Sequence, residues 1–346
     1  MSSPDLKPLI SHINLARGFR GGERQTELLI RELDALGFRQ RLIAKPSEPL
    51  IVRLADLPAL ERRPVSGIVG ATRAARGSDI VHSHEGRGIQ AAALAGLYYK
   101  VPYVVTRRVT RPLKANPITR GMYQRAAALI GLSRHISQQL ADYVGHTRIE
   151  TVPSAYMPTS IDKDRVRALR ERFGSQPIIG HVGALVIRHK GQPMLIDIAR
   201  ARPEYTIVLV GGGEDEQTLR HSAEGLSNVI FTGHVEDVPN HLAAFDVFAF
   251  PSRFEGLGST LLDAIARELP VVASDVDGIP DIIQHETNGL LAPNDDLELW
   301  LQHVDRLVED QDLGNRFALY NRELLSRYSA ERMATAYRDL YASILG

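Results

Sequence analysis

The chain of 346 residues contains no cysteine, no long apolar run and no excess of charge of either sign. The absence of cysteine excludes a disulfide framework, thiolate metal sites and cysteine nucleophiles. No run of about 18 apolar residues exists, so we predict no membrane-spanning helix. The first residues lack a basic segment followed by an apolar core, so we expect no signal peptide and a cytoplasmic protein. Lys and Arg number 41, as do Asp and Glu, which disfavours a protein that coats nucleic acid.

The charges are unevenly divided along the chain. Residues 1–158 contain 23 Lys and Arg but 12 Asp and Glu, whereas residues 159–346 contain 18 and 29. This division indicates that the basic half meets something anionic, such as an acidic lipid surface, a phosphorylated acceptor or nucleic acid. The alternative is a bipolar protein whose halves attract each other. Peripheral contact with the inner face of the cytoplasmic membrane stays open, and nucleic acid is not expected as a partner because the net charge is zero.

Short apolar runs alternate with helical patterns along the whole chain. Most runs lack strict alternation of polar and apolar residues, as is typical of strands covered on both faces. The sequence therefore predicts an α/β fold with parallel sheets. The predicted strands are 9–13, 41–44, 80–82, 103–106, 129–132, 149–152, 178–182, 205–210, 229–232, 247–250 and 271–273. The predicted helices include 26–36, 90–99, 134–144, 193–200, 260–268, 298–308 and 330–345.

The length is that of about two domains at roughly 150 residues each. A seam is predicted around residues 153–175, where two prolines end a strand and the charged stretch 162–172 follows. We therefore expect two doubly wound, Rossmann-like domains, residues 1–158 and 175–329, facing each other across a cleft. The last helix, 330–346, follows Ser329, which is a plausible N-cap.

Three glycine-containing loops carry residues suited to a ligand, and each has a plainer interpretation. Gly21-Gly22-Glu23 lies between a predicted strand and helix, where backbone amides can approach an anion, but a tight turn would look the same. Arg188–Gly191 follows strand 178–182, and its cations suit a diphosphate. The alternative is a solvated charged loop. Gly211–Gly213 permits a close approach of the backbone to a ligand or to another strand, and the plainer interpretation is a simple turn.

The segment Pro251–Ala264 is the most informative. A strand ends at Phe250, a glycine-containing turn presents Glu255, and a helix opens near Ser259. Free amides at the start of that helix can bind phosphate. Asp263 follows Glu255 by eight residues. Two carboxylates could thus hold the hydroxyls of a sugar and of a ribose, while the alternative is a capped helix with an incidental acid.

The segment 229–293 resembles the C-terminal domain of the retaining glycosyltransferases of family 4, which have the GT-B fold. The resemblance rests on Phe231–Val238, Phe245–Gly258, Glu268–Ser274, Gly278–Ile283 and Asn288–Pro293. In the first half, Gly21–Glu23 and Asp79–His84 are similar to looser family motifs. The resemblance implies that 1–158 binds the acceptor, that 175–329 binds the nucleotide sugar, and that the last helix packs back on the first domain.

The resemblance also implies roles for individual residues. Glu255, Lys190 and Arg188 would act in catalysis. Donor binding would involve Gly22, Gly183, His234, Val235, Gly256, Leu257, Gly258, Ser259, Thr260 and Asp263. The acceptor-side candidates are His84, Arg107 and Arg108, of which His84 is equally interpretable as a structural histidine.

Three positions depart from the family pattern. The second signature acid is Asp263 instead of glutamate, and Ala184 stands where an arginine is common, so Arg188 would replace it from a shifted position. A common first-domain histidine corresponds to Arg108. We interpret Arg107 and Arg108 as ligands of an anionic group.

No metal or cofactor is expected. Asp275-Val276-Asp277 mimics a metal motif of the other glycosyltransferase fold, but it precedes Gly278-Ile279-Pro280 as a family 4 loop does. The resemblance implies a metal-independent, retaining transfer of a hexosyl unit from a UDP- or GDP-linked sugar to a cell-envelope glycan or lipid-linked acceptor. The lipopolysaccharide core is one such acceptor. The alternatives are a nucleotide-sugar epimerase, a sugar phosphorylase, or a protein that binds a nucleotide sugar without catalysis.

Overall fold

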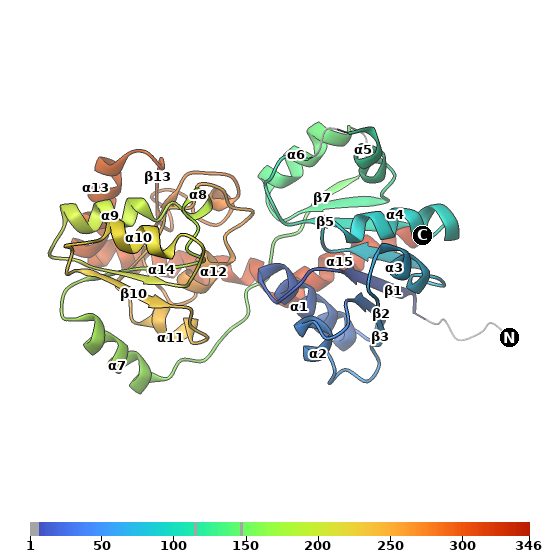
Figure 1. Cartoon of the computed structure of the whole chain (residues 1–346), viewed down its shortest axis with the longest axis horizontal. Coiled ribbons are helices and arrows are strands. Elements are labelled where there is room, and N and C mark those ends of the chain that lie inside the picture. Colours follow the sequence, from blue (N-terminus) through green and yellow to red (C-terminus); the bar gives the residue numbers. More distant parts are fainter. Residues whose placement is uncertain (1–6, 114–115, 146–147) are drawn as a thin grey trace. The chain divides into compact units, whose positions relative to one another are not determined.

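The computed structural model describes residues 7–113, 116–145 and 148–346 of the chain. Two compact units are formed, in each of which strands and helices alternate (Figure 1). Unit 1 comprises Met1–Ala155 and Tyr328–Gly346, and unit 2 comprises Tyr156–Arg327. The predicted α/β class with two parallel, Rossmann-like sheets is confirmed. Within the described residues, every helix is too short or too polar to cross a bilayer.

Unit 1 is built on a parallel sheet of seven strands in the order β3-β2-β1-β4-β5-β6-β7. Its strands are β1 (Leu9–Asn14), β2 (Arg39–Ala44), β3 (Glu61–Pro64), β4 (Ile80–Ser83), β5 (Tyr103–Arg107), β6 (Ala128–Gly131) and β7 (Ile149–Thr151). Its helices are α1 (Gly21–Ala35), α2 (Pro49–Arg53), α3 (Ile68–Ala74), α4 (Gly88–Tyr99), α5 (Pro117–Gln124), α6 (Arg134–Val144) and α15 (Ala330–Leu345). The central strands β1, β4 and β6 are fully buried, whereas the edge strands β3 and β7 are not. Strands covered on both faces need not alternate in polarity.

Helix α15 belongs to the core of unit 1 although it ends the chain. The Ser329 side chain accepts a hydrogen bond from the Arg332 amide and so caps the helix start. Tyr337 and Tyr341 are buried among the residues of β1, β4 and β5. The helix, red in Figure 1, packs against α1, which is blue. Unit 1 therefore holds both ends of the described chain.

Unit 2 is built on a parallel sheet of six strands in the order β10-β9-β8-β11-β12-β13. Its strands are β8 (Ile178–Val182), β9 (Thr206–Val210), β10 (Val229–Gly233), β11 (Val247–Phe250), β12 (Val271–Ser274) and β13 (Leu290–Ala292). Its α-helices are α7 (Lys163–Phe173), α8 (Ile187–Lys190), α9 (Pro193–Ala201), α10 (Glu216–Ser222), α11 (Val238–Ala243), α12 (Ser259–Ile265), α13 (Leu297–Glu309) and α14 (Gln311–Leu325). Its main core contains Trp300, Phe317 and the inner side chains of β8, β9 and β11.

Several elements differ from the sequence prediction. Helix α1 begins at Gly21 instead of residue 26, so Gly21 and Gly22 form its first turn and do not precede it. Helix α7 lies before the predicted start of the second domain at residue 175, yet it belongs to unit 2. The side chain of Asp162 caps α7, and Phe173 packs against Phe245. The sequence analysis assigned this charged segment to the seam because few of its residues are apolar.

Candidate functional site

Apart from Gly22, which lies in α1 of unit 1, the predicted donor-site residues lie at the carboxyl edge of the unit 2 sheet. Strand β8 is flanked by β9 and β11, and the strand order reverses between β8 and β11. Ligands of doubly wound sheets bind outside the carboxyl ends of the strands at such a reversal. Gly183 follows β8, Glu255 follows β11, and His234 follows β10. The topology therefore gathers residues that lie up to 72 positions apart in the sequence, from Gly183 to Glu255.

The loops after β8 and β9 pack closely against each other because they contain glycines. Gly211 has a φ of +136°, and a Cβ there would lie 2.0 Å from the Gly183 carbonyl oxygen. The Leu185 amide donates to the Gly212 carbonyl over 3.1 Å. The close approach left open for Gly211–Gly213 is thus an approach to another part of the chain. His234 is exposed beside Gly212, whose Cβ position is 3.9 Å from the His234 Cβ, and Val235 is half-buried.

The loop after β8 forms the short helix α8, which ends with Lys190. Gly191 then has a φ of +62°, and a Cβ there would lie 2.0 Å from the Pro251 carbonyl oxygen. The amides of Arg253 and Phe254 donate to the His189 carbonyl over 2.8 and 3.3 Å. Backbone contacts therefore lock the α8 segment to the loop after β11, and they require glycine at position 191.

Lys190 and Glu255 form an ion pair between Nζ and Oε2, with 23% and 17% of their side chains exposed. Lys190 Nζ also lies 5.1 Å from the centroid of the Phe250 ring. Gly183 is close by, with its Cβ position 3.9 Å from the Lys190 Cδ. Arg188, by contrast, is exposed and contacts the neighbouring His189. The structure thus brings Lys190, Glu255 and Gly183 together, and leaves Arg188 at the surface.

The backbone of Glu255 is held by Asp277. The Glu255 amide donates to Asp277 Oδ2 over 3.0 Å, and the Gly278 amide donates to the Glu255 carbonyl over 3.2 Å. Asp277 itself has a φ of +51°, an uncommon conformation outside glycine. The sequence analysis considered Asp277 only as a metal ligand. Its role in fixing the Glu255 turn could not be found from spacing, because the two residues belong to loops after different strands.

Helix α12 begins directly after this turn. Gly258 occupies the N-cap position and supplies no side-chain acceptor to the amides of the first turn. Ser259 is exposed and Thr260 half-buried, whereas Leu257 is buried and anchors the turn. Amides at a helix start are hydrogen-bond donors for an anion. Asp263 lies one turn further along and is half-buried, and Gly256 is half-buried beside Glu255.

Two buried polar side chains near this edge were missed by the sequence analysis. His181 is fully buried in β8, and its Nδ1 contacts the Ala249 carbonyl over 3.0 Å. Burial lowers the pKa of His181 to about 4, so the ring is neutral at pH 7. Gln192 is also fully buried and donates to the Ala184 carbonyl over 2.8 Å. A histidine inside an otherwise apolar strand was the available sequence signal.

The acceptor-side candidates lie in unit 1, where the strand order reverses between β1 and β4. His84 follows β4 and is 3% exposed. Arg107 ends β5, Arg108 follows it, and both are half-buried. Gly22 lies in the first turn of α1, and its Cβ position is 3.4 Å from the Arg108 Cδ. The structure therefore brings Gly22 and Arg108 together at the edge where His84 lies.

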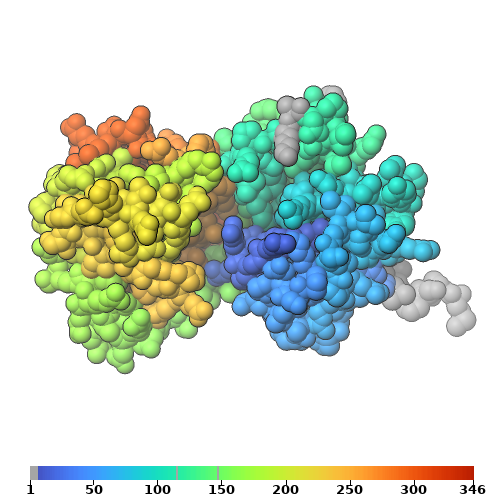
Figure 2. Space-filling model, in the orientation of Figure 1, coloured from blue at the N-terminus to red at the C-terminus, as the bar shows by residue number. Residues whose placement is uncertain are grey.

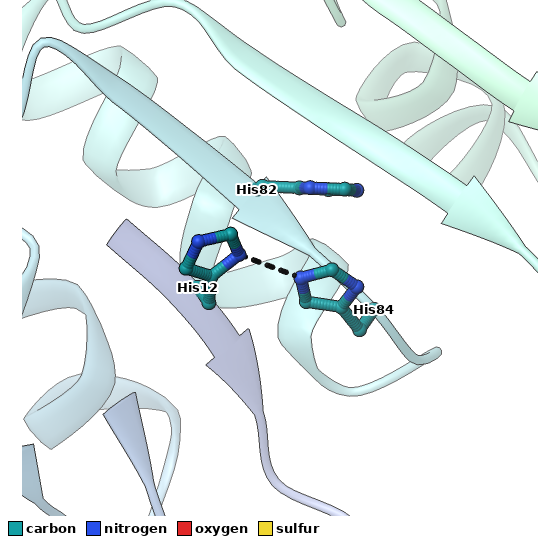
Figure 3. A group of neighbouring side chains, drawn as sticks. All are labelled: His12, His82 and His84. Carbon is teal, nitrogen blue, oxygen red and sulfur yellow. Dashed lines mark hydrogen bonds between the residues drawn. The ribbon is translucent and has the colours of Figure 1, made fainter. Parts of the chain in front are cut away.

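His84 is one of three histidines that meet in the interior of unit 1, together with His12 and His82 (Figure 3). Over the described ranges, this trio is the group whose side chains are close enough to share a metal ion. Asp275 and Asp277 do not form such a group there.

Each half of the chain matches a family model. Residues 20–155 match the glycosyl transferase 4-like domain, and residues 176–310 match the glycosyl transferases group 1. Together the two models cover most of each unit.

Named relatives agree with this assignment. A GDP-mannose-dependent alpha-(1-6)-phosphatidylinositol monomannoside mannosyltransferase of Mycobacterium tuberculosis is 35% identical over 182 residues, which are 45% of this chain. The match spans 47% of that relative, so about half of its length. The lipopolysaccharide core biosynthesis glycosyltransferase LpsE of Rhizobium meliloti is 30% identical over 65% of this chain and 63% of its own.

The fold agrees as well. The crystal structure of Anabaena HepE in complex with UDP superposes with a TM-score of 0.84 over 96% of this chain and 99% of its own, at 19% identity. The family models, the relatives and the two-sheet architecture lead to one conclusion. This chain belongs to the group 1, family 4-like glycosyltransferases with the GT-B fold.

Proposed function

We propose that this chain is a retaining, metal-independent glycosyltransferase that moves a hexosyl unit from a UDP- or GDP-linked sugar to a cell-envelope glycan or lipid-linked acceptor. The observation that carries the proposal is the Lys190–Glu255 pair, which lies where the strand order of unit 2 reverses, directly before α12. The mannosyltransferase of M. tuberculosis is named as GDP-mannose-dependent, and HepE was crystallised with UDP. Both names support a nucleotide-linked donor.

The chemistry requires stabilisation of a leaving diphosphate. Glycosyl transfer passes through an oxocarbenium-like state while negative charge grows on that group. Fixed donors aimed at the growing charge are the largest contribution a protein can make. Lys190 and the amides of Ser259 and Thr260 would supply them. The diphosphate then takes over Lys190 from Glu255, which frees the Glu255 carboxylate for the hydroxyls of the donor sugar.

We infer a front-face displacement for the retaining step. The acceptor oxygen bonds to the anomeric carbon as the bond from that carbon to the diphosphate oxygen breaks. The acceptor proton passes to the departing phosphate. No protein nucleophile is needed in this scheme, and Lys190 balances the charge of the departing diphosphate.

Two pockets of unit 1 support a lipid-linked acceptor and contact with an anionic membrane. One, of about 620 Å³, has Arg107 and Arg111 beside Val109 in its lining. The other, of about 790 Å³, is lined mainly by apolar residues of α4 and α5, with Lys100 and Arg125 among them. The linings of both pockets fall within residues 86–125, which belong to the cyan-to-teal part of the colour bar in Figure 2. Apolar side chains at the surface with cations beside them are typical of segments that bind anionic lipid.

A donor screen tests the proposed function. UDP-glucose, UDP-galactose, UDP-N-acetylglucosamine and GDP-mannose are each added to the full chain, and the melting temperature is measured with and without EDTA. We expect one donor to raise it, because a ligand that binds only the folded state stabilises that state. The shift and the subsequent diphosphate release should survive EDTA. No shift with any donor would contradict the proposal. Conversion of the donor into its epimer without acceptor would favour the epimerase alternative.

A vesicle experiment tests the membrane part. Ile118 is 73% exposed beside the apolar pocket, and Leu319 on α14 of unit 2 is 63% exposed. We expect the chain to cosediment with phosphatidylglycerol vesicles at low salt, Ile118→Asp to reduce binding severalfold, and the matched control Leu319→Asp to have no effect. An equal loss of vesicle binding in both variants, or no vesicle binding by the parent chain, would contradict the membrane proposal. The uneven charge division would then be explained by attraction between the two halves of the chain.

A further inference from the structure

The histidines of unit 1 form an ordered chain of hydrogen bonds that ends at the carboxyl edge of the sheet. His12 lies in β1, His82 in β4, and His84 directly after β4. Figure 3 shows the His12 and His84 rings joined edge to edge, with His82 beside them. His12 and His82 are 0% exposed and His84 is 3% exposed. Polar groups buried to this degree have defined partners.

The direction of each bond can be derived from Gln40. The Gln40 side-chain amide donates to the Ile30 carbonyl over 2.9 Å, so the other atom of the amide, Oε1, faces His12 as an acceptor. His12 Nε2 therefore carries the proton, at 3.1 Å from that oxygen. A neutral ring with a protonated Nε2 has a bare Nδ1. His12 Nδ1 must accept the bond of 3.0 Å from His84 Nε2.

The same reasoning fixes the tautomer of His84. Its Nε2 carries the proton, so its Nδ1 is a bare acceptor. That Nδ1 is buried and has no hydrogen-bond partner among the residues the structure describes. Burial lowers the pKa of His12 to about 4 and the pKa of His84 well below its usual value. Both rings are thus neutral at pH 7, and the chain of bonds points from His84 toward Gln40.

A donor without a partner lies at the same edge. Arg108 Nε is buried and unpaired within the described part of the chain. Strand β5 pairs with β4 through Ser83 and Val105, so His84 and Arg108 follow the last pair of these neighbouring strands by one and three residues. The Arg108 charge also contributes to the lowered pKa of His84. An unpaired acceptor and an unpaired N–H donor together suit a group that both donates and accepts, which is a hydroxyl.

A metal ion fits the trio poorly. Both ring nitrogens of His82 are already bonded, Nδ1 to the Tyr341 hydroxyl over 2.6 Å and Nε2 to Thr106 Oγ1 over 2.7 Å. Both nitrogens of His12 are also bonded. Ligation by all three rings would break at least two of these bonds and would place a cation near the Arg108 guanidinium. The hydrogen-bond chain explains the cluster without one.

We propose that His84 Nδ1 and Arg108 Nε bind one hydroxyl of a sugar substrate, and that His12 and Gln40 are positioning residues that keep the bare nitrogen of His84 turned toward that hydroxyl. The hydroxyl belongs either to the acceptor or to the donor sugar. This inference rests on the proposed function for the identity of the ligand. The hydrogen-bond chain itself does not depend on it.

Nitrogen NMR of the full chain, labelled with ¹⁵N-histidine, tests the chain of bonds without any substrate. We expect His12 and His84 to be neutral and protonated at Nε2 between pH 6 and pH 8. Gln40→Met removes the final acceptor and should redistribute the proton between the two nitrogens of both rings. A protonated Nδ1 on His84 in the parent chain overturns the inference. So does a stoichiometric shift of all three rings when zinc is added, which would mark a metal site.

Two substitutions of His84 test the hydroxyl site, with the donor found by the screen above. Asn places an acceptor oxygen near the position of Nδ1, whereas Gln places an N–H near that of Nε2 and leaves no acceptor at Nδ1. We expect His84→Gln to lower kcat/KM for transfer about 10- to 100-fold, the effect of one lost hydrogen bond in a buried site. His84→Asn should stay within about threefold. Equal losses in both folded variants, or no loss in either, overturn the inference.

The source of the hydroxyl follows from a second readout. Hydrolysis of the donor is measured without acceptor in the same variants. Loss of transfer with hydrolysis unchanged assigns the hydroxyl to the acceptor, and equal loss of both reactions assigns it to the donor sugar. If no donor binds or turns over, the proposed function fails. The ¹⁵N shifts of His84 during titration with methyl α-D-mannopyranoside then decide: movement of Nδ1 alone supports a hydroxyl site, and no movement contradicts it.

Discussion

The two units present opposite kinds of polar chemistry at equivalent places in their sheets. In unit 2, the ion pair of Lys190 and Glu255 is partly exposed. In unit 1, His12, His82 and His84 are buried, and burial lowers the pKa of each. A partly exposed ion pair can exchange partners more readily than a fully buried one, whereas a buried neutral chain of hydrogen bonds keeps a fixed direction. The same fold therefore offers a replaceable charge in one unit and an oriented acceptor in the other.

The largest expected difference concerns the stability of the units in acid. A buried histidine with a lowered pKa stays neutral in the folded state, while the unfolded state binds a proton below pH 6.5. Folding stability is therefore complete above that pH and falls as the pH drops toward the folded pKa. Each histidine can lower the free energy of unfolding by up to about 1.4 kcal/mol per pH unit, so three can lower it by up to about 4 kcal/mol per pH unit.

Native-state hydrogen exchange checks this contrast. Amides of β4 report on unit 1, where His12, His82 and His84 are buried among the described residues. Amides of β8 report on unit 2, where burial lowers the pKa of His181 to about 4. After correction for intrinsic exchange, the opening free energy in β4 should fall more steeply between pH 6.5 and pH 5. Parallel slopes in β4 and β8 would show that the buried rings of unit 1 are not kept neutral.

The replaceable charge of unit 2 should dominate turnover. Lys190→Ala removes one preoriented cation, and we expect kcat to fall at least about 100-fold, with a smaller effect on donor affinity. Arg220→Ala removes an exposed cation of α10 that pairs with Glu216 and serves as the matched control. A diphosphate-release assay measures both. Turnover of Lys190→Ala near that of the control would remove Lys190 from the mechanism.

The two sheets and the turn at Glu255 were predictable from the sequence, whereas the side-chain contacts that distinguish the two units were not, and the reasons are physical. Buried parallel strands read as apolar runs, so both sheets were found, apart from the polar edge strand β3 and the short β13. The turn at Glu255 was found because glycines and a helix start are local signals. The hydrogen bond between His84 and His12 joins residues 72 positions apart. The hydrogen bond between Asp277 and Glu255 joins the loops after two different strands, β12 and β11. No local pattern encodes such contacts.

The next largest effect should come from disturbing the backbone contacts between α8 and the loop after β11. Gly191→Ala places a Cβ 2.0 Å from the Pro251 oxygen in addition to a left-handed φ, whereas Gly225→Ala has a φ of +82° and no atom within 4 Å. We expect the free energy of unfolding to fall by about 1 kcal/mol in Gly225→Ala and by at least about 2 kcal/mol in Gly191→Ala. Urea unfolding followed through Trp300, buried in unit 2, measures both. Equal losses would show that the loops separate freely.

The smallest expected effect concerns Asp263. We expect Asp263→Ala to weaken nucleotide diphosphate binding about tenfold, the loss of one charge-assisted hydrogen bond to a ribose hydroxyl. Asp263→Glu restores the carboxylate with one more methylene and should bind within about threefold of the parent chain. Calorimetry with UDP and GDP gives both values. Unchanged affinity in Asp263→Ala would contradict a role of Asp263 in binding the nucleotide.

A crystal structure of the chain with bound UDP or GDP tests the central claim most directly. We predict that the diphosphate lies against the first amides of α12, with Lys190 turned from Glu255 to a phosphate oxygen. A diphosphate bound elsewhere, or a Lys190–Glu255 pair that persists beside it, would contradict the account of unit 2 as the carrier of the exchangeable charge.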